Sequence, residues 1–223
     1  MIYWFSFPLI FAAATAAIII SISHKRKNPA SPLPELTDWD RKLMVYHEAG
    51  HAVCSYYLPE REPMFVITID PSSDAFGMIG TKPRLHHNQT YVSMTSSIAT
   101  FMGGRIAEEM FCNEMTTSCI HDLKAAKTIA VNMVLTFGMG KKCGFSALQN
   151  SDELQISEQA KKDITDDIQQ ILNNAEKSAR CILSDHSNSV IKLANILLVR
   201  RTMTEAEINQ VFTQEDENEV ENQ

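Results

Sequence analysis

The sequence predicts a mainly α-helical domain that carries one small β-sheet and is preceded by a single transmembrane helix. Three observations lead to this prediction. Residues 2–23 are apolar and uncharged, most of the chain after residue 36 has apolar residues at helical spacing, and residues 64–81 have the pattern of short strands. The length of 223 residues suits one domain with accessory segments.

The composition excludes several classes of protein. Hydrophobic residues make up 44% and charged residues 21% of the chain, which is ordinary for a globular protein and excludes a wholly disordered one. The net charge of −7 argues against nucleic acid as a partner, because binding to phosphates requires a basic face. The five cysteines are scattered and odd in number, which favours a reducing compartment over a disulfide framework.

Residues 2–23 are predicted to cross a lipid bilayer. As a helix, this uncharged segment would span about 33 Å, enough for a hydrocarbon core of about 30 Å. The alternative is a cleaved signal peptide. However, the apolar run exceeds the usual core of about 7–15 residues, and no basic segment precedes it.

The segments on either side of the body complete the predicted domain organisation. Residues 24–36 form a basic and proline-rich linker, and their positive charge places the following body on the cytoplasmic side of the membrane. The body itself extends over residues 37–213. Residues 214–223 are acidic and are predicted to form a disordered tail.

The first helix of the body is predicted over residues 38–56. Thr37 has a suitable N-cap side chain, and Asp40 lies in the first turn, where an acidic group is favoured. Apolar and histidine side chains follow at helical spacing, and Pro59 ends the pattern.

The strands and the remaining helices follow in order. Residues 64–69 and 77–81 are predicted as paired strands, with the turn-like residues 70–74 between them. Thr204 and Glu207 form a capping box that opens a last short helix. Four helices are predicted between the strands and this box, over residues 90–111, 122–137, 158–185 and 190–199.

The first helix contains the motif H-E-x-x-H, from His47 to His51. Two histidines four residues apart lie on the same helix face, so both imidazoles can bind one Zn²⁺. Glu48 can then act as the base that takes a proton from the zinc-activated water. These residues predict a metal-dependent hydrolase.

The same motif can occur by chance in an amphipathic helix with two buried histidines and a solvated glutamate. Gly50 argues against that interpretation, because glycine within a helix costs about 1 kcal/mol relative to alanine. A close approach of another backbone at Gly50 would explain why the glycine is there.

A catalytic zinc ion needs a third protein ligand. The metzincin extension would place glycine at position 54 and histidine at position 57, but these residues are Cys54 and Tyr57. A thermolysin-type site would instead use a glutamate from a later helix. The candidates by residue type are Glu108, Glu109 and Glu114.

Four ordered blocks resemble the protease domain of the FtsH family, peptidase family M41. VYHEAGHAV at 45–53 is similar to the zinc helix of that family, and GGRIAEE at 103–109 to its G-G-R-x-A-E-E stretch. TTSCIHDL at 116–123 corresponds to T-T-G-A-S-N-D-[LI], and residues 130–139 resemble A-R-x-M-V-T-x-x-G-M. The resemblance covers residues 42–212.

The resemblance implies a zinc cofactor and makes Asp122 the third ligand, with His47 and His51. An acidic side chain is favoured at the start of a helix, where Asp122 lies. The chain departs from the family at residues 118–121, where Ser-Cys-Ile-His replaces Gly-Ala-Ser-Asn, so we expect a bulkier loop beside the cleft. His121 is expected to be a surface histidine, with a competing zinc ligand as the alternative, and Cys119 is expected to be packed.

The family joins this domain to an AAA ATPase, but the 223 residues contain no G-x-x-x-x-G-K-[ST] motif. We therefore expect a membrane-anchored zinc metalloendopeptidase without an ATPase of its own, which cleaves unfolded or short polypeptides. An AAA ATPase acting in trans and further copies of the chain are the expected partners. One alternative is a non-catalytic adaptor or regulatory subunit of a full-length FtsH-type protease, although the intact Glu48 argues against it. The other alternative is a soluble secreted protease.

Overall fold

The computed structural model describes residues 36–60, 64–70, 77–81, 88–144 and 157–221. The chain divides into two units, residues 1–36 and 37–223. The predicted transmembrane helix, residues 2–23, lies outside the described residues, as does nearly all of the linker. No helix within the described ranges has the length and apolar character needed to span a membrane.

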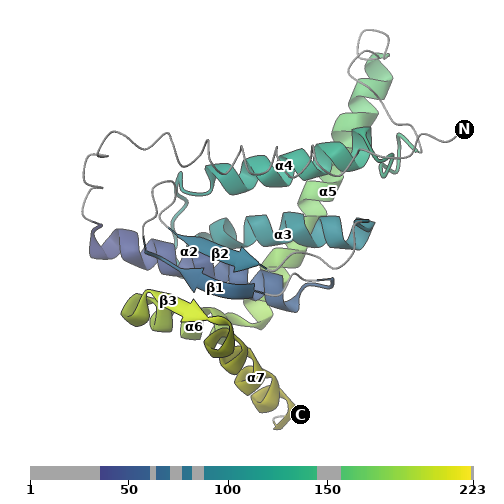
Figure 1. The fold of residues 1–223 in the computed structure, drawn as a ribbon. Coiled ribbons are helices and arrows are strands. Elements are labelled where there is room, and N and C mark those ends of the chain that lie inside the picture. The colour runs from purple at the N-terminus through teal and green to yellow at the C-terminus, as the bar shows by residue number, and fades with distance from the viewer. Residues whose placement is uncertain (1–35, 61–63, 71–76, 82–87, 145–156, 222–223) are drawn as a thin grey trace, which may run out of the picture. The chain divides into compact units, whose positions relative to one another are not determined.

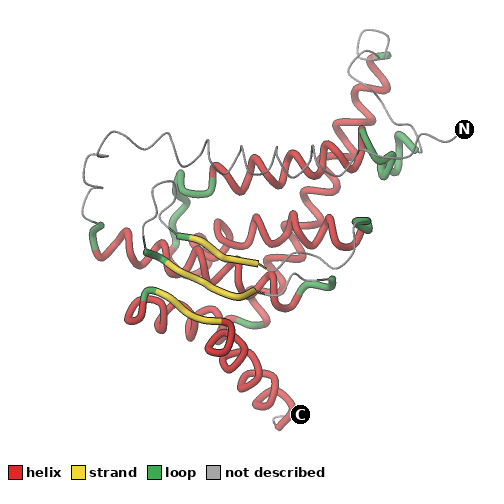
Figure 2. The backbone as a smooth tube through the Cα atoms, in the orientation of Figure 1, coloured by secondary structure: helices red, strands yellow, loops and turns green. Residues whose placement is uncertain are grey.

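The body is mainly helical with a small antiparallel sheet, as the sequence predicts (Figures 1 and 2). The elements occur in this order: α2 (Asp38–Tyr57), β1 (Met64–Thr68), β2 (Met78–Thr81), α3 (Tyr91–Ala107), the π-helix η1 (Glu108–Cys112), α4 (Ile120–Leu135), α5 (Glu158–Asp185), α6 (Ser187–Arg200), β3 (Thr202–Thr204) and α7 (Glu205–Glu221).

Local side-chain hydrogen bonds cap the first turns of helices α2 and α3. The Oγ1 atom of Thr37 accepts the N–H of Asp40 at 3.1 Å, and the Asp40 carboxylate accepts the N–H of Thr37 at 2.9 Å. This capping box satisfies two backbone donors at the start of α2 and confirms the predicted N-cap. Thr90 and Ser93 form the same arrangement at the start of α3.

The sheet has three strands in the order β2-β1-β3, and both pairs are antiparallel (Figure 1). The β1–β2 pair is the predicted one, whereas β3 was not predicted because three residues are too few to show an alternating pattern. At the end of α6 the chain turns at Arg201, which has a left-handed φ of 62°, and Thr204 then pairs with Val66. The third strand thus depends on contacts far apart in the sequence.

Helix α3 lies between α2 and α4 and also packs against α5 (Figure 1). Its Ile98 is fully buried, and Ala99, Ile106 and Ala107 join it in the core. Burial of these apolar side chains stabilises the helix layers by about 25 cal/mol per Å² of apolar surface removed from water. The packing therefore fixes α3 against the helix that carries the H-E-x-x-H motif.

Helix α7 includes residues 214–221, which belong to the segment that was predicted to form a disordered tail. The helix continues through Glu221, because Phe212 anchors it and no glycine or proline interrupts the following residues. The Phe212 ring is fully buried and stacks on Tyr56 of α2, with 3.9 Å between ring centroids. The glutamates and glutamine beyond this anchor are good helix formers, which allows the helix to extend.

A buried carboxylate holds the segment that follows α4. Asp167 of α5 accepts the backbone N–H of Lys142 at 2.8 Å and that of Cys143 at 3.0 Å. Burial favours the neutral acid, but these hydrogen bonds outweigh it and hold the pKa of Asp167 below its ordinary value of 3.8. The ionised form of Asp167 therefore stabilises the folded state.

Replacing Asp167 with Asn should destabilise the body by about 1.5–3 kcal/mol at neutral pH, because hydrogen bonds to a charged acceptor are lost. The folded pKa is depressed, so this contribution is fully present above pH 3.8 and disappears as the pH falls through the lower, folded value. Urea unfolding at a series of pH values measures the difference. The neighbouring Asp166, which pairs with Lys142 at 2.6 Å on the surface, provides the matched control. An Asp166→Asn variant as unstable as Asp167→Asn would contradict the assignment.

Candidate metal centre

Helix α2 brings its two histidines together on one buried face. His47 and His51 are 8% and 9% exposed, and their rings meet edge to face with 4.6 Å between centroids. This is the arrangement that the four-residue spacing predicts for a helix. Both rings point toward α3 and the start of α4.

Glycines allow the backbone of α3 to pass close to these rings. A Cβ atom at Gly50 would overlap the carbonyl oxygen of Gly103, so the predicted close approach at Gly50 is present. A Cβ atom at Gly104 would lie 2.5 Å from Nε2 of His51 and 2.7 Å from Nε2 of His47. Only a glycine therefore leaves room at position 104 for the two imidazoles.

Asp122, in the first turn of α4, completes a group of three metal-ligand atoms. Nε2 of His47 lies 3.0 Å from Nε2 of His51, and these nitrogens lie 3.2 and 3.4 Å from Oδ2 of Asp122. Within the described ranges, the structure thus brings together all three predicted ligands in an arrangement that could hold a metal ion.

The Nδ1 atoms of both histidines, which face away from Asp122, contact groups that can only accept hydrogen bonds. Nδ1 of His47 lies 2.7 Å from the Glu108 carboxylate, and Nδ1 of His51 lies 2.7 Å from the carbonyl oxygen of Thr100. Each Nδ1 must therefore carry the proton, which leaves Nε2 of a neutral imidazole as a lone-pair donor to a metal. The two bare nitrogens then face each other and a carboxylate oxygen, an arrangement that requires a cation.

The titration of this cluster follows from the same contacts. Burial opposes protonation of His47, but its hydrogen bonds to Asp122 and Glu108 outweigh burial and raise its pKa to about 9. Burial raises the pKa of Asp122, but the neighbouring histidines more than reverse this and hold it well below its ordinary value. A proton therefore competes with a metal for the cluster, and metal affinity should fall as the pH drops below about 9.

Glu108 contacts a predicted ligand and does not itself belong to the metal-ligand group of the described residues. It is 1% exposed, and Oε1 accepts from His47 while Oε2 accepts the N–H of Thr116 at 3.2 Å and its hydroxyl at 2.9 Å. These hydrogen bonds outweigh burial and lower the pKa of Glu108, so it is a charged acceptor. The sequence suggested Glu108 as a zinc ligand by residue type. It did not reveal that Glu108 accepts a hydrogen bond from His47.

The other glutamates considered from the sequence are not in the cluster. Glu109 forms an ion pair with Arg180 of α5 at 3.0 Å, and Glu114 is exposed. Glu108 and Glu109 lie at the start of η1, and Asn113 ends this π-helix with a left-handed φ of 54°. Such π-helical turns are frequent at functional sites.

Glu48 lies beside the cluster and is 7% exposed. Burial raises its pKa, and the nearby histidines His51 and His47 oppose the shift only in part. Gly77, which precedes β2, sits directly against this carboxylate, and a Cβ atom there would overlap Oε1 of Glu48. The predicted base is therefore desolvated and lies next to one end of strand β2.

The altered loop at residues 118–121 does not add a ligand to the described cluster. Cys119 is buried and its thiol lies 3.3 Å from the carbonyl oxygen of Thr116, whereas His121 is exposed. Neither residue belongs to the metal-ligand group. Ser118 instead contacts Glu108, at 2.7 Å.

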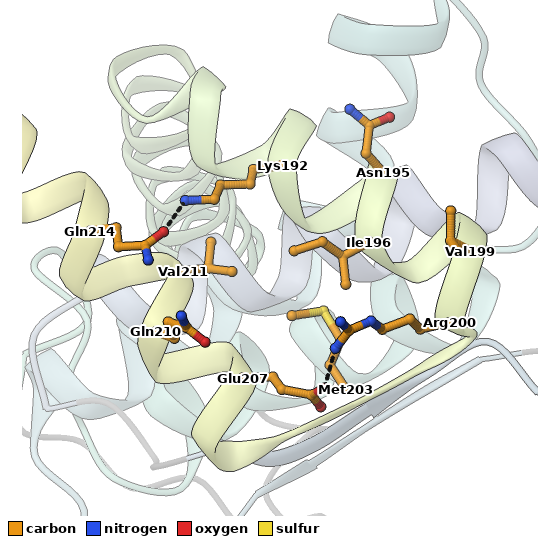
Figure 3. A pocket seen from close by; sticks show the side chains of 10 residues that line it. All are labelled: Lys192, Asn195, Ile196, Val199, Arg200, Met203, Glu207, Gln210, Val211 and Gln214. Atoms are coloured by element: carbon orange, nitrogen blue, oxygen red, sulfur yellow. Dashed lines mark hydrogen bonds and ion pairs between the residues drawn. The ribbon is translucent and has the colours of Figure 1, made fainter.

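Away from the metal-ligand group, a hollow with a volume of about 480 Å³ lies between α6 and α7 (Figure 3). A hydrogen bond between Lys192 and Gln214 and an ion pair between Arg200 and Glu207 cross it. None of its lining residues is a predicted site residue. They are Lys192, Asn195, Ile196, Val199, Arg200, Met203, Glu207, Gln210, Val211 and Gln214.

A helix-borne H-E-x-x-H motif, joined by a carboxylate from a later helix, is typical of metallopeptidases. Comparison with protein-family models agrees with this class. The model of peptidase family M41 matches residues 34–211, and the chain belongs to that family. This confirms the resemblance seen in the four sequence blocks.

Similar curated proteins carry the name ATP-dependent zinc metalloprotease FtsH. The protein from Nitrosococcus oceani is 29% identical over 189 residues, which cover 79% of this chain and 30% of that protein. The one from Rickettsia prowazekii is 31% identical over 190 residues, covering 80% and 30% respectively. This chain thus spans about 30% of the length of the curated relatives it matches. Their names and the donor set agree with the predicted zinc cofactor.

Replacing Glu108 with Gln should weaken zinc binding by about 10–100-fold, because the charged partner that orients His47 is lost. Competition with a chromogenic chelator measures the affinity. Glu109→Gln is the matched control, since its carboxylate faces Arg180, and it should stay near the wild-type value. Equal losses in both variants would refute the distinction between the two glutamates.

Proposed function

We propose that this chain is a membrane-anchored zinc metalloendopeptidase. The observation that carries the proposal is the spacing of the three acceptor atoms. Ligands at about 2.0–2.1 Å from a tetrahedral zinc ion lie about 3.3–3.4 Å from one another. The separations of 3.0, 3.2 and 3.4 Å among His47, His51 and Asp122 are close to this value, so the donor set fits zinc.

In this proposal His47, His51 and Asp122 hold the metal, and one ligand position stays open to solvent or substrate. When bound, zinc supplies a Lewis acid that polarises a peptide carbonyl and lowers the pKa of water to about 7. Glu108 and the carbonyl of Thr100 keep the imidazoles in the tautomer that presents Nε2.

Glu48 acts as the general base and later as the acid. Its carboxylate accepts a proton from the attacking water and passes that proton to the departing amine of the cleaved peptide. Burial raises its pKa, which makes the carboxylate a stronger base than an exposed glutamate. Gly77 leaves space for the carboxylate at the place where strand β2 begins.

Strand β2 offers a means of holding the substrate. It is an outer strand of the described sheet and starts next to Glu48, so an extended peptide could pair with it through backbone hydrogen bonds. Only a segment without stable structure of its own can adopt that geometry. Unfolded or short polypeptides are therefore the proposed substrates.

The proposal also includes the membrane and an energy source. Residues 2–23 would anchor the chain in the bilayer, with the protease body on the cytoplasmic side. The relatives are named ATP-dependent, and a AAA ATPase acting in trans or assembly of several copies would supply unfolded substrate to this chain. Purified chain should accordingly cleave an unstructured protein with zinc and without nucleotide.

Glu48→Gln should retain zinc and the fold but lose peptide hydrolysis by 10²–10⁴-fold or more, because the amide has nearly the same shape but is not a base. Casein digestion and zinc content, measured on the same preparation, test this. Glu114→Gln is the control, since Glu114 is exposed. Turnover near the wild-type rate in Glu48→Gln would overturn the assignment of Glu48 as the base, whereas a wild-type chain that binds zinc but does not cleave casein would favour the non-catalytic alternative.

Asp122→Asn should lower zinc affinity by at least about 100-fold, because an anionic ligand is replaced by a neutral amide. Zinc titration of the two variants Asp122→Asn and Glu114→Gln provides the comparison. Unchanged zinc affinity for Asp122→Asn with a loss for Glu114→Gln would move the site to a thermolysin-type arrangement.

A further inference from the structure

The segment between η1 and α4 contains a second hydroxyl that reaches the Glu108 carboxylate. Oγ of Ser118 lies 2.7 Å from Oε1 of Glu108. The same oxygen accepts the Nδ1–H of His47, also at 2.7 Å. Ser118 and His47 therefore both donate to one oxygen atom of Glu108.

The contact connects the elements that carry the proposed ligands. Thr116 already binds the other carboxylate oxygen through its N–H and its hydroxyl. Helix α4 begins directly after Cys119, and Asp122 lies in its first turn. Glu108 thus joins His47 on α2 to the segment that positions Asp122.

Two hydroxyl groups, those of Thr116 and Ser118, take part in three short contacts in this segment. The hydroxyls of Thr116 and Ser118 each lie within hydrogen-bond distance of Glu108, and they are 2.7 Å from each other. Each hydroxyl has one proton, so these hydroxyls can donate only two of the three hydrogen bonds, and the two to the charged carboxylate are the stronger ones. Without the Ser118 hydroxyl, Oε1 of Glu108 would keep only the His47 donor.

We propose that Ser118 is a positioning residue for the metal centre and acts through Glu108. It fixes the Asp122 segment at the distance from His47 that the metal requires. The proposal rests on the proposed function, since it assumes that these residues bind zinc. Ser118 lies in the block that resembles T-T-G-A-S-N-D-[LI], at the position of its glycine, and a glycine has no side chain that could make this contact.

Zinc affinity of the 223-residue chain tests the proposal, with a competing chelator as the probe. Ser118→Ala should weaken binding by about 10-fold, as expected for loss of an outer hydrogen bond to a ligand network. Ser118→Thr keeps the hydroxyl and should restore most of the affinity. Thr117→Ala, at the exposed neighbouring position, is the matched control and should bind as the wild type does.

A double-mutant cycle separates positioning from a general structural effect. In a Glu108→Gln background, Ser118→Ala should change zinc affinity by less than about 2-fold, because the group through which it acts is altered. A full 10-fold loss in that background, or unchanged affinity of Ser118→Ala in the wild-type background, would overturn the proposal. Failure of the wild-type chain to bind zinc would instead refute the proposed function itself.

Discussion

The site depends on three hydrogen-bond acceptors that face one another. The charged Glu108 and the carbonyl of Thr100 take the outer protons of His47 and His51, so both inner nitrogens point, without protons, at each other and at Asp122. Such an arrangement is unfavourable until a cation occupies its centre. Either a proton or a metal can supply the charge, and the spacing of the atoms suits zinc.

Close packing of helices makes this arrangement attainable. Gly50 and Gly103 let α2 and α3 approach until their backbones touch, and Gly104 leaves the space that the imidazoles occupy. The π-helical turn that follows α3 then directs Glu108 inward to His47, while Glu109 points to Arg180. The core of α3 therefore determines both the space around the cluster and the hydrogen bonds that orient it.

The sequence predicted those features of the site that depend on local spacing or on a motif. Helical periodicity placed His47 and His51 on one face, and the cost of glycine in a helix pointed to the close contact at Gly50. The role of Glu108 could not be predicted, because it requires knowing that a π-helical turn aims one of two adjacent glutamates inward. Strand β3 was missed because its pairing with β1 is long-range. Helix α7 continues to Glu221, beyond the Phe212 ring that stacks on Tyr56.

The coordination of a bound zinc ion tests the central claim most directly. Crystals of the zinc-loaded chain, measured with anomalous diffraction at the zinc edge, would locate the metal and its ligands. The account predicts one zinc ion per chain, bound by Nε2 of His47, Nε2 of His51 and a carboxylate oxygen of Asp122. A zinc ion bound through the thiol of Cys119, the ring of His121 or the carboxylate of Glu108 would contradict it.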